Sequence, residues 1–136
     1  MKVKVKHHSN GAAYQCGSHS LPAESDEFYS FTLFVDGQKV GEVIACKTKW
    51  GFWETHSDIY NSYHRGRGYG IYLYGYALNW MHRYGYEVRS STTPSNAAIR
   101  LWNSTRLAQK FNVRYTGTRY KVLDVNKKPL KRVVFG

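Results

Sequence analysis

The sequence predicts an α+β domain built on a mostly antiparallel sheet of about six or seven strands, flanked by helices. Three observations lead to this prediction. Several short segments carry the alternating or β-branched and aromatic pattern of strands, and two of them are joined by a tight hairpin turn. A glycine-rich turn then enters the longest helical pattern, over residues 70–84. A further strand, a second helix and two more strands follow it.

The strands before the glycine turn are predicted to form an antiparallel meander. Residues 28–35 are rich in β-branched and aromatic side chains and end at Asp36-Gly37, a strong hairpin signal. Residues 39–47 are the partner strand, and residues 53–60 form the next strand after a break at 50–52. About three strands therefore lead to the glycine turn.

The N-terminal segment is predicted to be less regular. Residues 2–6 alternate lysine and valine, which indicates a strand at the edge of the sheet. Residues 9–20 are rich in Ser, Gly and Asn and are expected to form a loop. Residues 21–27 are interpreted as a short turn of helix.

The helix over residues 70–84 is predicted to end at Gly85, a natural residue just past a helix C-terminus. Its aromatic and aliphatic residues recur at helical spacing and form one broad stripe. The stripe resembles a stacking platform for bases, but such a stripe is far more often a core face, and we interpret it so. Its members are Tyr69, Tyr72, Leu73, Tyr76, Ala77, Trp80, Met81 and Tyr84.

The second half of the chain is predicted to continue with a strand over residues 86–92 and a helix over residues 96–111 that Ser95 caps. Strands over residues 113–122 and 129–135 follow. The second helix is expected to turn inward Ala98, Leu101, Trp102 and Thr105.

Length and composition indicate one globular domain over residues 1–136, without repeats or an internal linker. Neither an apolar run of about 20 residues nor a secretory pattern is present, so we expect a cytoplasmic protein with no membrane association. Cys16 and Cys46 lie outside any metal-ligand spacing; we expect reduced thiols and no metal, with a disulfide as the alternative.

Charge is unevenly distributed. The chain carries a net charge of +11, and residues 1–58 hold 6 Lys and 7 acidic residues. Residues 59–136 hold 14 Lys and Arg and only 2 acidic residues. This charge favours an anionic ligand or partner: a nucleotide-like cofactor, nucleic acid or an acidic surface.

The segment His64-Arg65-Gly66-Arg67-Gly68-Tyr69-Gly70 carries the clearest chemical signal. Alternate glycines allow a tight turn and the close approach of a ligand to the backbone. The turn leads into a helix whose first N–H groups lack intrahelical partners and carry partial positive charge. A strand, a glycine turn and a helix N-terminus together are typical of a phosphate or pyrophosphate site.

The residues of this turn resemble the cofactor motif of the GNAT superfamily of acyl-CoA-dependent N-acyltransferases. That motif, Arg/Gln-x-x-Gly-x-Gly/Ala, is matched by Arg65-Gly66-Arg67-Gly68-Tyr69-Gly70. A second family motif, at the start of the next helix, is similar to Asn96-Ala97-Ala98-Ile99-Arg100-Leu101-Trp102, with the spacing of the histone-acetyltransferase-like branch. The resemblance implies a GNAT-like, mixed, mostly antiparallel sheet that splays open around the cofactor.

The resemblance also implies that acetyl-CoA is the acyl donor, bound along the strand before the turn. The main chain of Asp58, Ile59 and Tyr60 would pair with pantetheine, and the Tyr60 N–H would polarise the thioester carbonyl. Asn96 and Trp102 would contact the cofactor from the second helix. The pyrophosphate would be held at Arg65, Gly66, Arg67, Gly68, Tyr69 and Gly70.

An ammonium acceptor must lose a proton before it can attack, so a base is required. Glu54 lies six residues before Tyr60, where the histone-acetyltransferase-like branch carries its general base. Alternation along the strand places Glu54, His56, Asp58 and Tyr60 on one face. Glu54 and His56 therefore both stay candidates for the base.

The chain departs from the family in three respects. Trp102 stands where many members carry a tyrosine that protonates the departing thiolate; water, Ser104 and Tyr72 stay open for that role. Nine residues separate Trp102 from Phe111, where the family typically has five. The N-terminal region lacks the two amphipathic helices that build the family's acceptor site. We expect that site to be open or shaped by a partner chain, for example in a homodimer.

The leading hypothesis is an acetyl-CoA-dependent N-acetyltransferase in which an amine attacks the thioester directly. The basic second half suggests an acceptor on an acidic macromolecule, either nucleic acid or an acidic protein. The alternative is a non-catalytic GNAT-like binding or structural protein that associates with nucleic acid. A basic β-rich RNA-binding domain unrelated to CoA would explain the charge but neither motif.

Overall fold

The structure is a computed structural model that describes residues 1–8, 15–16, 19–20, 27–48, 50–59, 67–92 and 94–125. For residues 15–16, 19–20, 58–59 and 123–125 it describes the backbone alone. No helix in these described parts is both long and apolar enough to cross a membrane.

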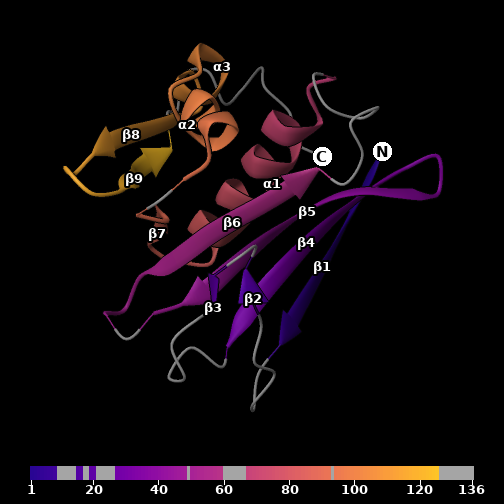
Figure 1. Cartoon of the computed structure of the whole chain (residues 1–136), viewed down its shortest axis with the longest axis horizontal. Coiled ribbons are helices and arrows are strands. Elements are labelled where there is room, and N and C mark those ends of the chain that lie inside the picture. Colours follow the sequence, from indigo (N-terminus) through magenta and orange to yellow (C-terminus); the bar gives the residue numbers. More distant parts are fainter. Residues whose placement is uncertain are drawn as a thin grey trace.

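A seven-stranded sheet forms the centre of the molecule (Figure 1). Every neighbouring pair in it is antiparallel except β6 and β7, so the sheet is mixed and mostly antiparallel. This confirms the predicted α+β fold class. In spatial order the strands are β1 (Lys2–His8), β4 (Phe28–Val35), β5 (Gln38–Lys47), β6 (Trp53–Ile59), β7 (Val88–Ser90), β9 (Tyr120–Val125) and β8 (Phe111–Tyr115).

The parallel pair of β6 and β7 is short. Its register joins Trp53 to Val88, Glu54 to Arg89 and Thr55 to Ser90. β7 ends there, while β6 continues to Ile59. The sheet is therefore splayed between these two strands.

The N-terminal strands follow the predicted pattern. β1 lies at the edge of the sheet beside β4, and its lysines alternate with partly buried valines. β4 and β5 are joined by a tight turn in which both Asp36 (φ 51) and Gly37 (φ 78) have positive φ. The 9–20 segment contains two short strands, β2 (Gln15–Cys16) and β3 (His19–Ser20), that pair with each other. The expectation of loop alone was therefore wrong there.

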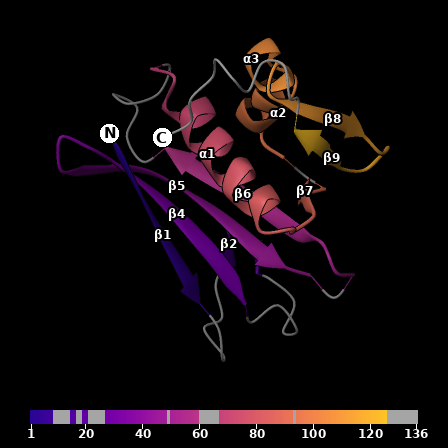
Figure 2. The same cartoon turned by 180° about the vertical axis from the view of Figure 1, so that it is seen from behind.

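Helix α1 (Tyr69–Arg83) lies across one face of the sheet (Figures 1 and 2). Its buried face confirms the core interpretation for Leu73, Ala77 and Met81. The arc is rotated from the predicted stripe, because Tyr74 and Leu78 are also buried while Tyr84 is 59% exposed. The remaining stripe residues, Tyr69, Tyr72, Tyr76 and Trp80, pack partly buried against the core.

The predicted helix over residues 96–111 was wrong as a single element. It is two helices, α2 (Asn96–Trp102) and α3 (Thr105–Ala108), and Phe111 already begins β8. Asn103 ends α2, and its side-chain Nδ2 donates to the Ile99 carbonyl at 2.8 Å and the Tyr120 hydroxyl at 2.9 Å. Thr105 is exposed rather than inward.

Two strand predictions also need correction. The segment 113–122 is not one strand: β8 ends at Tyr115, the chain turns around Gly117 (φ 99), and β9 begins at Tyr120. The Thr-Gly-Thr sequence at this turn is the signal that was missed. The strand over residues 86–92 is shorter than predicted, because only Val88–Ser90 pairs with neighbours. The predicted helical turn, apart from Glu27, and the predicted strand 129–135 lie outside the described residues.

Candidate active site

The described part of the glycine turn presents an uncapped helix N-terminus. Gly68 is the N-cap of α1, with φ 82 in the left-handed region that favours glycine, and no side chain caps the helix. The first turn of α1 contains no acidic residue. A helix N-terminus of this kind carries partial positive charge, which favours an anion. Tyr60, Arg65 and Gly66 lie outside the described residues.

Two arginines lie at this turn, and a buried lysine lies near one of them. Arg67 precedes it and is exposed. A Cβ placed on Gly68 would lie 3.8 Å from Nη1 of Arg106, so a guanidinium from α3 stands beside the turn. Lys110 is 6% exposed, and burial, followed by the charge of Arg106, lowers its pKa to about 8. Sequence reasoning missed Arg106 and Lys110, because the break between α2 and α3 was not predicted.

Helix α2 packs close to the same turn. A Cβ on Gly70 would lie 3.7 Å from Cδ1 of Leu101, an ordinary contact, so the turn could hold an alanine there. Asn96 begins α2 and is exposed, while Trp102 at its end is 3% exposed. Ser95 caps α2 as predicted, accepting a hydrogen bond from the Ala98 N–H at 3.1 Å.

Trp102 is the predicted cofactor contact with an unusual environment. Its ring lies edge-on to Tyr74 at 5.5 Å between centroids and is stacked on Tyr120 at 5.8 Å. The indole Nε1–H lies near the Tyr74 hydroxyl, yet it makes no hydrogen bond of ordinary geometry with any described residue. A buried donor without a partner is uncommon and indicates a ligand or strain.

Strand β6 places its side chains on two faces, as predicted. Thr55 faces α1, because its hydroxyl accepts a hydrogen bond from the Tyr74 hydroxyl at 3.0 Å. Glu54 and His56 therefore lie on the opposite face, which we call the far face. There they contact each other: His56 Nε2 is 2.8 Å from Glu54 Oε1. The structure thus brings both predicted candidates for the base together.

The far face also carries a residue that the sequence did not indicate. Arg119, 65 residues along the chain, pairs through Nη1 with Oε2 of Glu54. The same nitrogen donates to the Ser90 carbonyl at 2.9 Å, and the guanidinium lies 4.9 Å from the centre of the Phe52 ring. Only the turn between β8 and β9, which was not predicted, brings Arg119 here.

These contacts set the charge of Glu54. Burial raises the pKa of this carboxyl, but the hydrogen bonds and charges of His56 and Arg119 outweigh burial and lower it below 4.5. Glu54 is therefore ionised at neutral pH, with a donor on each oxygen. A carboxylate in this state is a weak base.

Apolar residues border the pair on the far face. In register, Cys46 lies beside Glu54 and Ile44 beside His56, while Phe28 follows on β4. All three side chains are buried, and the thiol of Cys46 is fully buried. Helix α1 does not cover them, because it lies on the other face of the sheet. Other parts of the chain therefore cover this region, and the β2–β3 hairpin lies on this side of the sheet (Figures 1 and 2).

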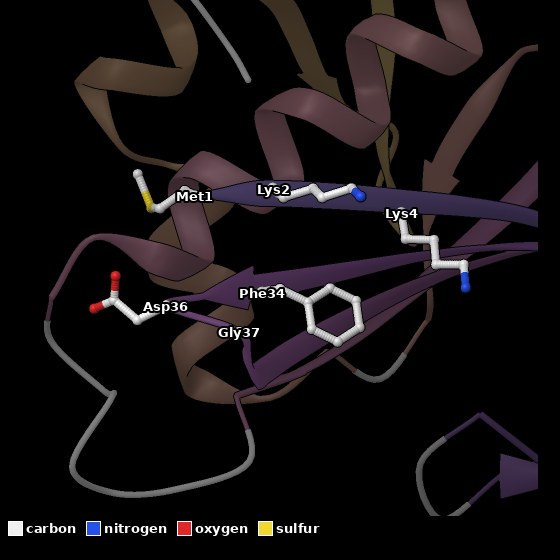
Figure 3. A pocket seen from close by; sticks show the side chains of 6 residues that line it. All are labelled: Met1, Lys2, Lys4, Phe34, Asp36 and Gly37. Atoms are coloured by element: carbon white, nitrogen blue, oxygen red, sulfur yellow. The ribbon is translucent and has the colours of Figure 1, made fainter.

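A hollow of about 540 Å³ lies elsewhere, at the β1 edge beside the β4–β5 turn (Figure 3). None of the predicted site residues lines it. In the described parts of the chain, no group of three His, Cys, Asp or Glu side chains is placed to hold a metal ion. The lining residues of the hollow are Met1, Lys2, Lys4, Phe34, Asp36 and Gly37.

Comparisons with known proteins give a likeness of fold. No family model and no curated protein matches the sequence. Among solved structures, the chain is similar to a domain from Methanocaldococcus jannaschii, with 14% identity and a TM-score of 0.50 over 89% of this chain and 96% of that one.

Two further similar structures are acetyltransferases. One is a putative GnaT-family acetyltransferase from Bordetella pertussis, with 24% identity and a TM-score of 0.42 over 70% of this chain and 62% of that one. The other is a GNAT family N-acetyltransferase (YhbS) from Escherichia coli in complex with CoA, with 17% identity and a TM-score of 0.46 over 81% and 64%. The chain spans less than two thirds of the length of these two proteins.

The arrangement of the sheet matches what the sequence resemblance implies. The sheet is mixed, it splays between β6 and β7, and the strand at the splay is followed by the glycine turn and α1. The chain is therefore similar in fold to the Methanocaldococcus jannaschii domain, and its splayed mixed sheet is the arrangement that the sequence resemblance implies.

Proposed function

We propose that the chain is an acetyl-CoA-dependent N-acetyltransferase. One observation carries the proposal: the uncapped N-terminus of α1 at Gly68 follows the strand that bears the Glu54–His56 pair and borders the splay. An anion site and a proton acceptor thus lie on consecutive elements. This is the pairing that transfer from an anionic acyl donor to an amine requires.

The residues present fit acetyl-CoA. The N–H groups of Tyr69 and Gly70, together with Gly68, would bind the pyrophosphate, with Arg67 and Arg106 adding charge. Arg65 and Gly66 belong to the same proposed site. When bound, acetyl-CoA supplies the acetyl group as a reactive thioester.

The strand edge at the splay is suited to the pantetheine arm. On its β7 side, the described part of β6 is paired from Trp53 to Thr55 and no further. The main chain of Asp58 and Ile59 is left to pair with the amides of a ligand, with Tyr60 next along the chain as the proposed donor to the thioester carbonyl. Asn96 and Trp102 would contact the same arm from α2.

The cofactor site is tested by two substitutions at one position. Gly70→Glu places a carboxylate at the anion site and should abolish acetyl-CoA binding measured by calorimetry. Gly70→Ala adds a methyl group at ordinary contact distance from Leu101 and should fold and retain binding. Equal affinity in Gly70→Glu and wild type would contradict the site assignment.

We propose that the acceptor amine is carried by an acidic macromolecule, with nucleic acid favoured over an acidic protein. The support is the charge of residues 59–136, which include 14 basic residues and only 2 acidic ones. This excess is larger than one CoA pocket requires. A transferase acting on a small neutral amine would gain nothing from it.

A second function is supported by a specific observation. Glu54 has both oxygens occupied, by His56 and Arg119, and Trp102 replaces a proton-donating tyrosine. These features favour a GNAT-like protein that binds nucleic acid without turnover. Thiol release from acetyl-CoA with a panel of amines separates the two, because a binding protein would release none.

A further inference from the structure

We propose that His56 is the base that takes the proton of the acceptor amine, and that Glu54 and Arg119 are positioning residues that hold it. This inference rests on the proposed acetyltransferase function. It reassigns the role that position alone would give to Glu54, and it assigns a role to Arg119, which neither sequence motif includes.

Each oxygen of the Glu54 carboxylate already accepts one hydrogen bond. Oε1 is 2.8 Å from His56 Nε2, and Oε2 pairs with Arg119 Nη1. An ionised carboxylate can only accept hydrogen bonds, so the nitrogen that faces it must carry a proton. Each oxygen keeps a second acceptor site, but the two donors stabilise the anion and make Glu54 a weaker base.

The tautomer of His56 decides which of its ring nitrogens is basic. If Nε2 carries the proton toward Glu54, the lone pair of the neutral imidazole lies on Nδ1. The imidazole is part-buried, with 12% of its side chain exposed. Nδ1 is thus the basic atom of the pair, and the carboxylate behind it stabilises the imidazolium that forms.

Several contacts hold Arg119 in place. Its guanidinium contacts Glu54, the Ser90 carbonyl and the Phe52 ring. Its own turn is closed by the Thr116 N–H, which donates to the Arg119 carbonyl at 2.8 Å. Strand β9 is tied to β7 next to it, since the Tyr120 N–H donates to Ser90 Oγ at 2.8 Å. Arg119 therefore fixes the carboxylate that orients His56.

The transfer removes two protons from the ammonium group of the acceptor. Nδ1 of His56 takes one proton from the ammonium group, and the neutral amine nitrogen forms the new bond to the acetyl carbonyl carbon. The carbon–sulfur bond breaks, and the second proton of the nitrogen leaves with the thiolate as a thiol. The proton on His56 then passes to solvent, which restores the base.

Other charged side chains share the far face with His56. They come from β1, β5, β8 and β9, and from β7 with the residue before it. Apart from His8 in the control variant, they are unchanged in the test variants. Shifts in pH dependence can therefore be attributed to the substituted group. These side chains are Lys2, Lys4, Lys6, His8, Glu42, Glu87, Arg89, Arg114 and Lys121.

The test is the pH dependence of thiol release from acetyl-CoA with an amine acceptor. For the wild-type chain we expect kcat to fall tenfold per pH unit on the acid side, beginning above the pH range in which carboxylates titrate. A Glu54 base would keep kcat level to below about pH 4.3. His56→Gln should lower kcat by about 100-fold or more. His8→Gln, a control on the same face, should leave it unchanged.

Substitutions at the two positioning residues should move the acid-side fall in kcat, which we call the acid limb, in opposite directions along the pH axis. Glu54→Gln removes a negative charge beside the imidazole and should shift the limb to lower pH, whereas Arg119→Met removes a positive charge and should shift it to higher pH. Arg119→Lys should restore the limb while kcat recovers only in part, because lysine lacks the planar guanidinium. A purely structural role would lower kcat without these opposed shifts.

The outcomes are separable. Undiminished release by His56→Gln, or an acid limb in the carboxylate range, would overturn this assignment and leave the acetyltransferase function standing. Absence of thiol release from wild type with every amine, while acetyl-CoA still binds, would overturn the proposed function and the assignment together. Circular dichroism on each variant identifies any that fails to fold, and the Arg119→Lys arm then still decides the role of Arg119.

Discussion

Glu54 illustrates how one side chain joins folding to function. Its carboxylate is 16% exposed and ties β6 to the β8–β9 turn through Arg119. A part-buried charge is tolerated because it has two donors, and removing one partner of such a group is costly because the other is left uncompensated. Glu54 therefore stabilises the far face as well as charging it.

We predict that Glu54→Gln lowers the free energy of unfolding at pH 7 by about 1 to 3 kcal/mol, measured by urea denaturation. The pKa of Glu54 is lower in the folded state than its ordinary value of 4.5. Its stabilisation is therefore present above pH 4.5 and lost as pH falls through the folded-state pKa. The gap between the two proteins should close in acid.

The control is Glu87→Gln. Glu87 also pairs with basic residues, Arg89 and Lys121, but 42% of its side chain is exposed. Exposed pairs contribute about 0 to 1 kcal/mol. An equal loss in both variants would contradict the importance that we assign to the burial of Glu54.

Lys110 gives a second residue-level prediction. Burial and Arg106 lower its pKa from 10.5 to about 8. Between these values the unfolded chain binds the proton and the folded chain does not, so the contribution of Lys110 to stability rises with pH. Lys110→Met should be more stable than wild type below about pH 8, and this gain should disappear by about pH 10.5. A gain of equal size at both ends would mean that apolar contact, not charge burial, produced it.

At the scale of elements, the break between α2 and α3 places the basic groups beside the glycine turn. Asn103 ends α2, and Ser104 caps α3 by accepting a hydrogen bond from the Leu107 N–H at 3.2 Å. This new helix start carries Arg106 toward Gly68. A continuous helix would give residues 103–110 a different direction.

We predict that Ser104→Ala lowers the free energy of unfolding by about 1 kcal/mol, because the cap of α3 is lost. Thermal denaturation followed by circular dichroism measures the change. Ser104→Gly should cost only a few tenths of a kcal/mol. Ser95→Ala at the cap of α2 should cost a similar amount to Ser104→Ala; no loss at either position would show that these caps do not limit stability.

At the scale of the whole molecule, the charge distribution implies binding that depends on salt. The basic residues outnumber the acidic ones by 11 over the chain, and the excess lies after residue 58. Each phosphate that a protein neutralises releases counterions from nucleic acid, which makes affinity fall with salt.

We predict retention on single-stranded RNA or DNA at low salt. If roughly four phosphates are neutralised, affinity should fall about 50-fold between about 50 and 200 mM salt, measured by fluorescence anisotropy. Polyglutamate is the comparison ligand. Retention on polyglutamate but not on nucleic acid would identify an acidic protein as the partner class, and retention on neither would contradict an acidic macromolecule.

The sequence by itself determined the parts that depend on neighbours along the chain. The β4–β5 turn followed from Asp36-Gly37, the start of α1 from its glycines, and the shared face of Glu54 and His56 from alternation. These features need only local backbone geometry and the two-residue period of a strand.

Tertiary structure alone decided what Glu54 and His56 can do. Arg119 and Arg106 reach the site across turns whose direction depends on how β8, β9 and α3 pack, and no local pattern encodes that packing. His56 and an arginine placed 65 residues away together change this carboxylate from a candidate base into a fixed anion. The physical reason is that charge acts through space, so the state of Glu54 depends on the groups that folding brings within contact distance.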